Sequence, residues 1–287
     1  MSGWQSGHAA SCKAFYGGLI PTSATNINYI NNINIEYNSL MNTTLYIVAG
    51  SSGLIGHYVC NKLNESSDKF IGLDAKEGKF SNIVDLSDQG KLIEIIDSHV
   101  DSNIKDISLI YSAGKNGTVE YGGLDDFGAY SQDNLSEYFF QNSVLPYSCS
   151  MSLINYAKEK NIKLKILILC SHYSFVAGTD ALYNKSTSEI KKIKPHGYII
   201  SKHAVIGVIK SLASTYGSDR VLINGFAPGG ISNNQDEEFV NKFKEYSPLK
   251  RLASPDEIAE WIYLIANPKL TYGNGSIFNI DGGVLIR

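Results

Sequence analysis

The sequence predicts an α/β protein with a doubly wound fold, in which helices cover both faces of a seven-stranded parallel sheet. Short runs of aliphatic residues alternate along the chain with segments of helical periodicity. A glycine-rich turn follows the first aliphatic run, and an acidic residue ends the second. Parallel neighbours need a long crossover between them, and helices of this spacing supply it.

Seven segments are expected to form the strands, because each is short, aliphatic and followed by a turn or a helical pattern. In chain order they are Leu45–Ala49, Lys69–Leu73, Ile83–Leu86, Ile107–Tyr111, Lys165–Cys170, Val221–Phe226 and Ser276–Ile280. Two helices are also marked. Apolar residues recur at helical spacing over Ile200–Leu212, with a stop at Gly217, and Ser254-Pro255-Asp256-Glu257 is a capping box with proline at the first helical position.

Residues 42–287 are predicted to form a single domain, because no linker or internal repeat interrupts the alternation. Residues 1–41 differ from the rest, since they are rich in Asn, Ser, Gly and Ile and carry almost no charge. We expect them to be a poorly ordered extension. The alternating polar and apolar residues of Asn26–Asn38 leave an added edge strand open.

Charge and composition argue against several classes of protein. A net charge of -3 over 287 residues gives no electrostatic footprint for nucleic acid or an anionic membrane. The four cysteines lack ligand spacing, so neither a disulfide framework nor a metal site is expected. No apolar run reaches the length of a membrane span, and the N-terminus lacks the pattern of a secretory signal. The expectation is a cytoplasmic protein with a small-molecule substrate.

The turn after the first strand has the spacing of a phosphate-binding site. Gly50 permits a tight turn, Gly53 lets the backbone approach a pyrophosphate, and Gly56 lets the next helix pack on the strand. Amides at the helix N-terminus then face the anion. The same turn contains Ser52, Leu54 and Ile55. A Rossmann domain that binds a dinucleotide is predicted, and the competing interpretation is a glycine-rich turn without a ligand.

Asp74 ends the second strand, 18 residues after Gly56. A carboxylate at this place hydrogen-bonds the ribose hydroxyls of NAD and repels the 2′-phosphate of NADP. We therefore expect NAD(H) to be favoured over NADP(H), although Lys76 nearby argues the other way. The alternative is a solvated acid at a strand end.

Tyr198 and Lys202 lie four residues apart and would share one helix face. An ammonium close to a phenol stabilises the phenolate, so we expect Lys202 to lower the pKa of Tyr198 from about 10 toward neutrality. Such a tyrosine can exchange a proton with an alcohol or ketone oxygen. Surface decoration is the alternative for an isolated pair of this kind.

Taken in order, these and further motifs resemble the short-chain dehydrogenase/reductase family from about Leu45 to Gly283. The resemblance is carried by Gly50, Gly53, Gly56, Asp85, Ser112-Ala113-Gly114, Asn142, Ser171, Tyr198, Lys202, Pro228-Gly229 and Asp281-Gly282-Gly283. It implies a nicotinamide cofactor and a homo-oligomer, a tetramer or a dimer, packed through the helices around Asn142 and Tyr198.

The resemblance also implies roles. Tyr198 is the general acid in reduction and the base in oxidation, Lys202 assists it and holds the nicotinamide ribose, and Ser171, with Ser174 as the alternative, orients the substrate oxygen. Asn142 holds a water that links Lys202 to solvent. The implied cofactor-binding residues are Gly50, Ser52, Gly53, Leu54, Ile55, Gly56, Asp74, Asp85, Leu86, Ser112, Ala113, Gly114, Tyr198, Lys202, Pro228, Gly229 and Ile231. The implied substrate-binding residues are Ser171, His172, Tyr173, Tyr198 and Gly230.

Several positions depart from the family pattern. The glycine spacing resembles the extended branch, such as sugar-nucleotide epimerases, while the C-terminal half resembles the single-domain reductase branch. Ser112 replaces the usual asparagine, so we expect one turn-stabilising side chain to be missing. The threonine usual after the Pro-Gly turn is absent, and Asn233 or Ser232 would then bind the carboxamide.

Thr179–His196 is an insertion beside the expected active site, and we expect it to shape the substrate pocket. Its Lys191, Lys192 and Lys194 would either meet an anionic substrate or form a solvated charge run. The segment Ile193–Tyr198 resembles reductases encoded with acylneuraminate and flagellin-glycan genes. Ser232–Tyr246 resembles the family's mobile substrate lid.

The function expected from these observations is an NAD(P)-dependent oxidoreductase that interconverts a secondary alcohol and a ketone. A sugar or nucleotide-sugar of surface-glycan biosynthesis is the favoured substrate, and a 3-oxoacyl thioester or another small ketone is the alternative. The remaining alternatives are an NAD-retaining sugar epimerase or dehydratase and a non-catalytic nucleotide sensor or scaffold.

Overall fold

The structure is a computed structural model, and it describes residues 43–117, 119–121, 132–178, 180–183 and 191–286. The predicted N-terminal extension over residues 1–41, with its segment Asn26–Asn38, lies outside the described residues. Asn42–Arg287 form one compact unit.

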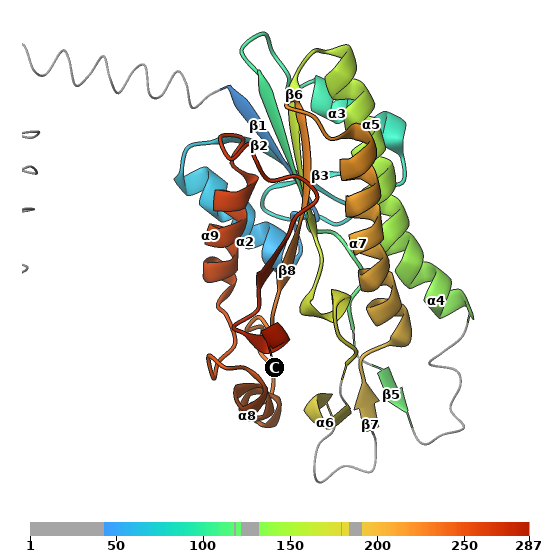
Figure 1. The fold of residues 1–287 in the computed structure, drawn as a ribbon. Helices are drawn as coiled ribbons and strands as arrows, with labels where there is room; N and C mark the ends of the chain where they lie inside the picture. The colour runs from blue at the N-terminus through green and yellow to red at the C-terminus, as the bar shows by residue number, and fades with distance from the viewer. Residues whose placement is uncertain (1–42, 118, 122–131, 179, 184–190, 287) are drawn as a thin grey trace, which may run out of the picture. The chain divides into compact units, whose positions relative to one another are not determined.

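A seven-stranded sheet with strand order β3-β2-β1-β4-β6-β8-β9 forms the centre of this unit (Figure 1). Every neighbouring pair in it is parallel. Its strands are β1 (Thr44–Ala49), β2 (Lys69–Asp74), β3 (Ser81–Ile83), β4 (Asp106–Tyr111), β6 (Lys163–Leu169), β8 (Val221–Pro228) and β9 (Ile277–Ile280). The predicted doubly wound parallel sheet is confirmed, and its strand order reverses between β1 and β4, where such folds bind ligands.

The third strand was predicted in the wrong place. Strand β3 pairs with β2 over Ser81–Ile83, so it overlaps the predicted segment Ile83–Leu86 only at Ile83. Ile83 is exposed at the sheet edge, whereas Val84 and Leu86 are buried in the core beyond it. The aliphatic pattern therefore reflects core packing of the turn after β3, not strand pairing.

Helices cover both faces of the sheet, and alternate residues of β1 face each layer. Leu45 and Ile47 lie in the core beneath α3, α5 and α7, while Tyr46 and Val48 lie in the core beneath α2 and α9 (Figure 1). The helices of these layers are α2 (Leu54–Glu65), α3 (Gln89–Asp97), α4 (Gln132–Phe139), α5 (Leu145–Glu159), α7 (His196–Tyr216) and α9 (Pro255–Ala266).

Two predicted helix boundaries are confirmed. Helix α7 ends before its C-cap Gly217. At the start of α9, Ser254 accepts a hydrogen bond from the Glu257 amide, and the Glu257 carboxylate accepts one from the Ser254 amide. This reciprocal pair satisfies amides that the first helical turn leaves without partners.

The predicted insertion contains two short elements, α6 (Asp180–Tyr183) and β7 (Lys191–Ile193). Strand β7 pairs antiparallel with β5 (Val119–Tyr121), which follows β4. Helix α8 (Glu237–Tyr246) lies at the same end of the unit as α6 and this ribbon (Figure 1). All of these elements follow the carboxyl ends of the central strands, so they extend the edge where the site lies.

Three short turns complete the described chain. A π-helical turn, Phe140–Val144, joins α4 to α5, and 3₁₀ turns span His172–Ser174 and Val284–Ile286. No helix in the described part of the chain combines the length and the apolar character that a membrane crossing requires.

Candidate active site

The glycine turn after β1 is shaped by backbone contacts that a side chain would break. Gly50 has φ +87°, and an added Cβ would lie 2.5 Å from the Ala113 amide nitrogen. A Cβ on Gly56 would lie 2.0 Å from the Gly50 carbonyl oxygen. Gly53 is different, since its nearest contact would be 3.3 Å away. Packing requires glycine at positions 50 and 56, but it does not require glycine at position 53.

Ser112 stabilises this turn, so the prediction that a turn-stabilising side chain is missing was wrong. Its hydroxyl donates to the Ala49 carbonyl oxygen at 2.8 Å. The backbone amides of Ser112 and Ala113 donate to the same carbonyl. A short hydroxyl reaches β1 because β1 and β4 are adjacent in the sheet.

Asp74 lies beside the turn at the end of β2. Its carboxylate accepts a hydrogen bond from the Ser52 amide at 3.0 Å and another from the Lys76 amide at 3.0 Å. The acid and the glycine turn are therefore joined directly, as expected of a site that spans a ribose and a phosphate.

Asp85 and Leu86 lie beyond the end of β3 and away from the main pocket. The exposed Asp85 carboxylate accepts from the Ser87 amide at 2.8 Å, which lowers the pKa of that acid. Leu86 is buried in the core. The structure thus gives Asp85 a local role in its own turn.

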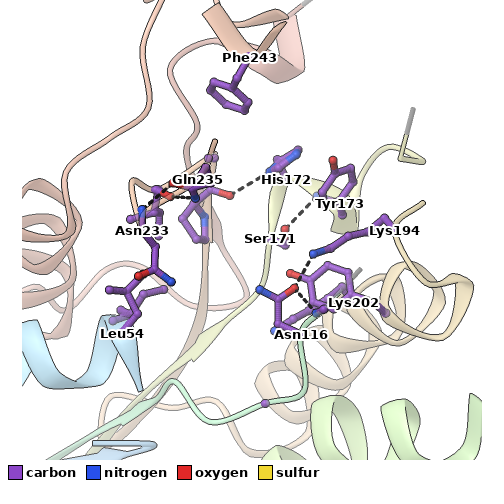
Figure 2. A pocket seen from close by; sticks show the side chains of 18 of the residues that line it. Leu54, Asn116, Ser171, His172, Tyr173, Lys194, Lys202, Asn233, Gln235 and Phe243 are labelled. Carbon is purple, nitrogen blue, oxygen red and sulfur yellow. Dashed lines mark hydrogen bonds between the residues drawn. The ribbon is translucent and has the colours of Figure 1, made fainter. Parts of the chain in front are cut away.

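A pocket of about 600 Å³ lies where the glycine turn meets the carboxyl ends of β6 and β8 (Figure 2). Among the predicted site residues, its lining includes Gly53, Leu54, Ile55, Gly56, Ser112, Gly114, Ser171, His172, Tyr173, Tyr198, Lys202, Pro228, Gly229, Gly230 and Ile231. The predicted residues that do not line it are Gly50, Ser52, Asp74, Asp85, Leu86, Ala113 and Asn142. Most of the two predicted sets therefore meet in one cavity.

Tyr198 lies in the first turn of α7 with its ring buried against Tyr138 and Tyr173. Burial raises the pKa of Tyr198 to about 12, and the neighbouring Ser171 hydroxyl opposes this shift. The expected lowering of the Tyr198 pKa by Lys202 was wrong. Removing the phenol from water disfavours its charged form, and this effect dominates.

Lys202 lies one turn further along α7. Its ammonium donates to the Leu169 carbonyl oxygen at 2.9 Å and lies 6.0 Å from the centre of the Tyr198 ring. Burial lowers the pKa of Lys202 to about 8. Both members of the pair are thus shifted toward their neutral forms.

Asn142 lies in the π-helical turn between α4 and α5, an irregularity that is frequent at functional sites. Its amide accepts from the Lys115 backbone nitrogen at 2.8 Å and donates to the Lys115 carbonyl and to the Ser201 hydroxyl. A Cβ on Gly114 would lie 2.6 Å from the Asn142 Oδ1 and 3.9 Å from the Lys202 Nζ. Asn142 therefore fixes the segment after β4 beside Lys202.

Ser171 lies two residues beyond the end of β6 and caps the start of the 3₁₀ turn. Its hydroxyl accepts from the Tyr173 amide, while Ser174 accepts from the Ser171 amide at 3.2 Å, so the two serines form a capping box. Ser171 faces the pocket, and Ser174, its predicted alternative, does not line it. The turn holds Ser171 at the pocket wall.

His172 is buried in the same turn. Its Nδ1 lies 3.3 Å from the Pro228 carbonyl oxygen, and its ring lies 4.0 Å from that of Tyr173. Burial lowers the pKa of His172 to about 4. The imidazole is therefore neutral at neutral pH, with Nδ1 donating to Pro228.

The loop after β8 is closed by Gln235, which the sequence analysis did not single out. Its side chain donates to the Ile231 carbonyl oxygen at 2.6 Å and accepts from the Asn233 amide at 2.6 Å. Asn233 and Gln235 both line the pocket, and Ser232, the alternative to Asn233, does not. Figure 2 shows Asn233 and Gln235 on the side of the pocket that carries Leu54.

Lys194 connects the insertion to the active site. It lies between β7 and α7, lines the pocket, and donates to the Asn116 side-chain oxygen. Its ammonium lies 4.4 Å from the centre of the Tyr198 ring, closer than that of Lys202. Burial, followed by repulsion from Lys202, lowers the pKa of Lys194 to about 8. The solvated-charge interpretation is wrong for this lysine.

Comparison with known proteins gives matches to a family model and to individual relatives. A family model described as enoyl-(acyl carrier protein) reductase matches residues 182–285. The 3-oxoacyl-[acyl-carrier-protein] reductase of Aquifex aeolicus is 34% identical over 91 residues, which are 30% of this chain and 37% of that enzyme. Short-chain dehydrogenase reductase 3a of Arabidopsis thaliana is 33% identical over 104 residues, 33% of this chain and 40% of that protein. Over its C-terminal part the chain is therefore similar to members of the short-chain dehydrogenase/reductase family.

A solved structure extends the likeness to the whole fold. A short-chain dehydrogenase from Leptospira borgpetersenii, with bound NAD+, has a TM-score of 0.69 and 23% identity, over 85% of this chain and 93% of that one. The sequence alignments above cover less than half of the length of either relative. The solved structure therefore shows the fold, and the sequence matches show similarity to this family over about a third of the chain.

Two parts of the pocket wall lie outside the predicted catalytic, cofactor-binding and substrate-binding residues, and one of them, α8, lies within the predicted lid segment Ser232–Tyr246. Aromatic residues from α8, Phe239 and Phe243, and Leu182 and Tyr183 from α6 line the pocket. The amphipathic pattern of Glu237–Tyr246 was the available signal for α8. For α6, four helical residues inside a polar insertion gave none.

Proposed function

We propose that this chain is an NAD(P)-dependent oxidoreductase that interconverts a secondary alcohol and a ketone. The proposal is carried by one observation: Ser171, Tyr198 and Lys202 converge on a pocket that also includes the glycine turn at the start of α2. Proton-transfer groups beside a phosphate-binding turn are what hydride transfer to a carbonyl requires. A nucleotide sensor or scaffold has no need of this set, so it is the less favoured alternative.

The residues of the turn fit a nicotinamide dinucleotide. Gly53 precedes α2 and has no side chain that would obstruct the close approach of a pyrophosphate, and the N-terminus of α2 offers amides to it. Asp74 and the Ser52 amide would hold the adenosine ribose, and Lys202 the nicotinamide ribose. When bound, the nicotinamide supplies or accepts the hydride.

The proposed proton chemistry follows from the two shifted pKa values. With its pKa raised to about 12, the Tyr198 phenol keeps its proton at neutral pH and is available as an acid for the carbonyl oxygen. The Ser171 hydroxyl would hydrogen-bond the same oxygen and orient it. With its pKa lowered to about 8, Lys202 exchanges its proton readily near neutrality, which suits a group that restores the proton of Tyr198.

We infer that NAD(H) is favoured over NADP(H), because the Asp74 carboxylate is held beside the turn where a 2′-phosphate would lie. The test is a fluorescence titration with NADH and NADPH of the wild type, of Asp74→Ser, and of the control Asp219→Ser, at an exposed acid distant in sequence from the turn. We expect NADH to bind more tightly, and the preference to fall at least tenfold in Asp74→Ser alone. Tighter binding of NADPH by the wild type would reverse the assignment, and failure to bind either would remove the proposed function.

For the substrate, we propose a sugar or nucleotide-sugar of surface-glycan biosynthesis, which rests on the resemblance of Ile193–Tyr198. A 3-oxoacyl thioester is the second candidate, favoured by the 34% identity with the 3-oxoacyl reductase. An NAD-retaining epimerase or dehydratase, suggested by the glycine spacing alone, would be purified with tightly bound NAD and would cause no net change in NADH.

We further propose that residues 42–287 are the catalytic domain and that it assembles as a homo-oligomer, a dimer or tetramer. Exposed apolar side chains on the helices around the site support the assembly: Phe140, Val144, Tyr147 and Ile200. The described cysteines, Cys60, Cys149 and Cys170, are buried free thiols, which supports a reducing compartment such as the cytoplasm.

A further inference from the structure

Four lysines line the pocket, and they differ in how their charges are balanced. Lys115 pairs with Glu137, and Lys242 pairs with Glu238 at 3.0 Å. Lys202 donates to the Leu169 carbonyl oxygen. Lys194 donates to the Asn116 amide oxygen, and no carboxylate pairs with it in the described part of the chain.

The surroundings of Lys194 disfavour its charge in this state. Its ammonium lies over the Tyr198 ring at 4.4 Å and 5.9 Å from the centre of the Tyr183 ring. The Lys202 ammonium lies 6.0 Å from the centre of the Tyr198 ring. Repulsion between the two ammonium groups acts together with burial to lower the pKa of Lys194. A buried charge without a counter-charge is costly, so an anion bound at this place would be stabilised.

The geometry leaves Lys194 free to bind such an anion. An ammonium has three N–H donors, and Asn116 accepts from one of them. Figure 2 shows Lys194 reaching across the pocket toward Asn116, with Ser171 beside it. The Asn116 amide therefore holds the ammonium next to the proposed catalytic hydroxyls while leaving donors for a ligand.

The acidic residues that line the pocket do not compete for this site. Asp236 caps α8 by accepting from the Phe239 amide at 2.9 Å, and Glu238 is paired with Lys242. The remaining wall beside Lys194 is aromatic: Tyr173 and Tyr183 are joined through their hydroxyls at 2.6 Å. The pocket therefore offers the Lys194 ammonium, with Lys202 nearby, and an aromatic surface for the body of a substrate.

We propose that Lys194 binds a carboxylate or phosphate of the substrate, so that the substrate class is an anionic carbonyl compound whose acid group lies a few bonds from the reacting carbon. The position relative to the reacting carbon rests on the proposed function, because it takes Tyr198 as the group that meets the carbonyl oxygen. Lys194 contacts the Tyr198 ring, so an acid group at about 2.8 Å from the ammonium lies in the same part of the pocket as that oxygen.

The test is a calorimetric titration with two probes, succinate and inorganic phosphate, each with and without saturating NADH. The proteins are the wild type, Lys194→Gln, Lys194→Arg and the control Lys210→Gln, at an exposed lysine of α7. We expect at least one probe to bind the NADH complex, Lys194→Gln to weaken it tenfold or more, Lys194→Arg to retain most of it, and Lys210→Gln to leave it unchanged. The tenfold loss corresponds to about 1.4 kcal/mol.

The outcomes separate this inference from the proposed function. Equal affinity of Lys194→Gln and wild type, or no saturable binding of either probe at millimolar concentrations, overturns the inference. Displacement of the probe by NADH assigns the anion site to the cofactor and also overturns it. If NADH does not bind but the Lys194-dependent probe does, the anion site stands and the proposed function falls. Unchanged unfolding temperatures of the variants exclude a loss of fold.

Discussion

At the scale of single residues, burial decides the protonation states of this site. Tyr198, Lys202 and His172 are all shifted toward their neutral forms, and burial is the largest cause for each. The i,i+4 spacing of Tyr198 and Lys202 suggested that attraction between opposite charges would set their pKa values. This attraction contributes less than burial, because the Lys202 ammonium is hydrogen-bonded to a backbone carbonyl. At neutral pH the site therefore holds its proton on the phenol.

The buried His172 makes stability depend on acidity. Its pKa is near 4 in the folded chain and near 6.5 when unfolded, so the unfolded state binds more protons between these values. Stability from this group is complete above pH 6.5 and is lost as the pH falls toward 4. The loss is on the order of 3 kcal/mol. Asp281 and Lys194, the charged groups that act on the imidazole, have opposing effects.

Urea unfolding of wild type and His172→Phe between pH 7.5 and 4 checks this prediction. We expect the wild type to lose more stability than the variant across this range, with most of the difference below pH 6.5. Parallel pH profiles for the two proteins would show that His172 does not titrate in this way.

At the scale of elements, the glycine turn separates what folding needs from what a cofactor needs. Gly56→Ala would place a methyl group 2.0 Å from the Gly50 carbonyl oxygen, whereas the Gly53→Ala methyl group would meet the same oxygen at 3.3 Å, with a φ of -71° that alanine adopts freely. We expect Gly56→Ala to lower the unfolding temperature by several degrees. Gly53→Ala should cost less, on the order of 1 kcal/mol, because glycine is preferred over alanine at an N-cap.

Binding then distinguishes the two roles. If the backbone at Gly53 contacts a pyrophosphate, a methyl group at this position hinders that close approach, so the NADH dissociation constant of Gly53→Ala should rise tenfold or more in a fluorescence titration. A well-folded Gly53→Ala protein that binds NADH like the wild type would contradict a phosphate-binding role for the turn.

The end of α9 is held on the sheet by two polar side chains from inside it. Lys165 on β6 donates to the Asn267 and Leu270 carbonyl oxygens at 2.9 and 2.8 Å, and Ser108 on β4 donates to the Ala266 carbonyl oxygen at 2.7 Å. These carbonyls lie at or beyond the last turn of the helix, where no helical partner exists. Burial lowers the pKa of Lys165 to about 8, because the location disfavours the charged ammonium. The hydrogen bonds of the ammonium offset this cost.

Lys165→Met should therefore destabilise the fold by about 1 to 3 kcal/mol, because it removes two hydrogen bonds made by a buried ammonium. Lys163→Met, at an exposed position of the same strand, is the matched control and should change stability little. Denaturant unfolding of both variants measures the difference. Equal stability of the two would mean that the Lys165 hydrogen bonds contribute nothing net.

At the scale of the whole molecule, local patterns predicted the sheet and its helices, and non-local contacts account for what they missed. Strand β1 and helix α9 carry strong periodic and capping signals, so they were placed within two residues. The stretch Ile83–Leu86 misled because burial in a turn and burial in a strand select the same side chains. The ribbon of β5 and β7 joins segments about 70 residues apart in sequence, which no local pattern indicates.

In the site too, local patterns predicted some features and non-local contacts account for the others. Motif order was sufficient to predict that Ser171, Tyr198 and Lys202 meet in one pocket. It did not predict that Lys194 lies over the Tyr198 ring, because that contact depends on how the insertion folds back and on Asn116 after β4. The pKa values also required the structure, since burial of the phenol cannot be derived from a four-residue spacing.

The central claim is that Tyr198 is the proton donor of a nicotinamide-dependent reductase. It is tested most directly by following NADH absorbance at 340 nm with wild type and Tyr198→Phe over a panel of keto-sugars, nucleotide-sugars, oxo acids and 3-oxoacyl thioesters. We expect the wild type to oxidise NADH with at least one of these, and Tyr198→Phe to be slower by about 10² to 10⁴ with an unchanged NADH dissociation constant. A Tyr198→Phe rate within tenfold of the wild type, or a wild type that binds NADH and reduces none of the panel, would contradict the claim.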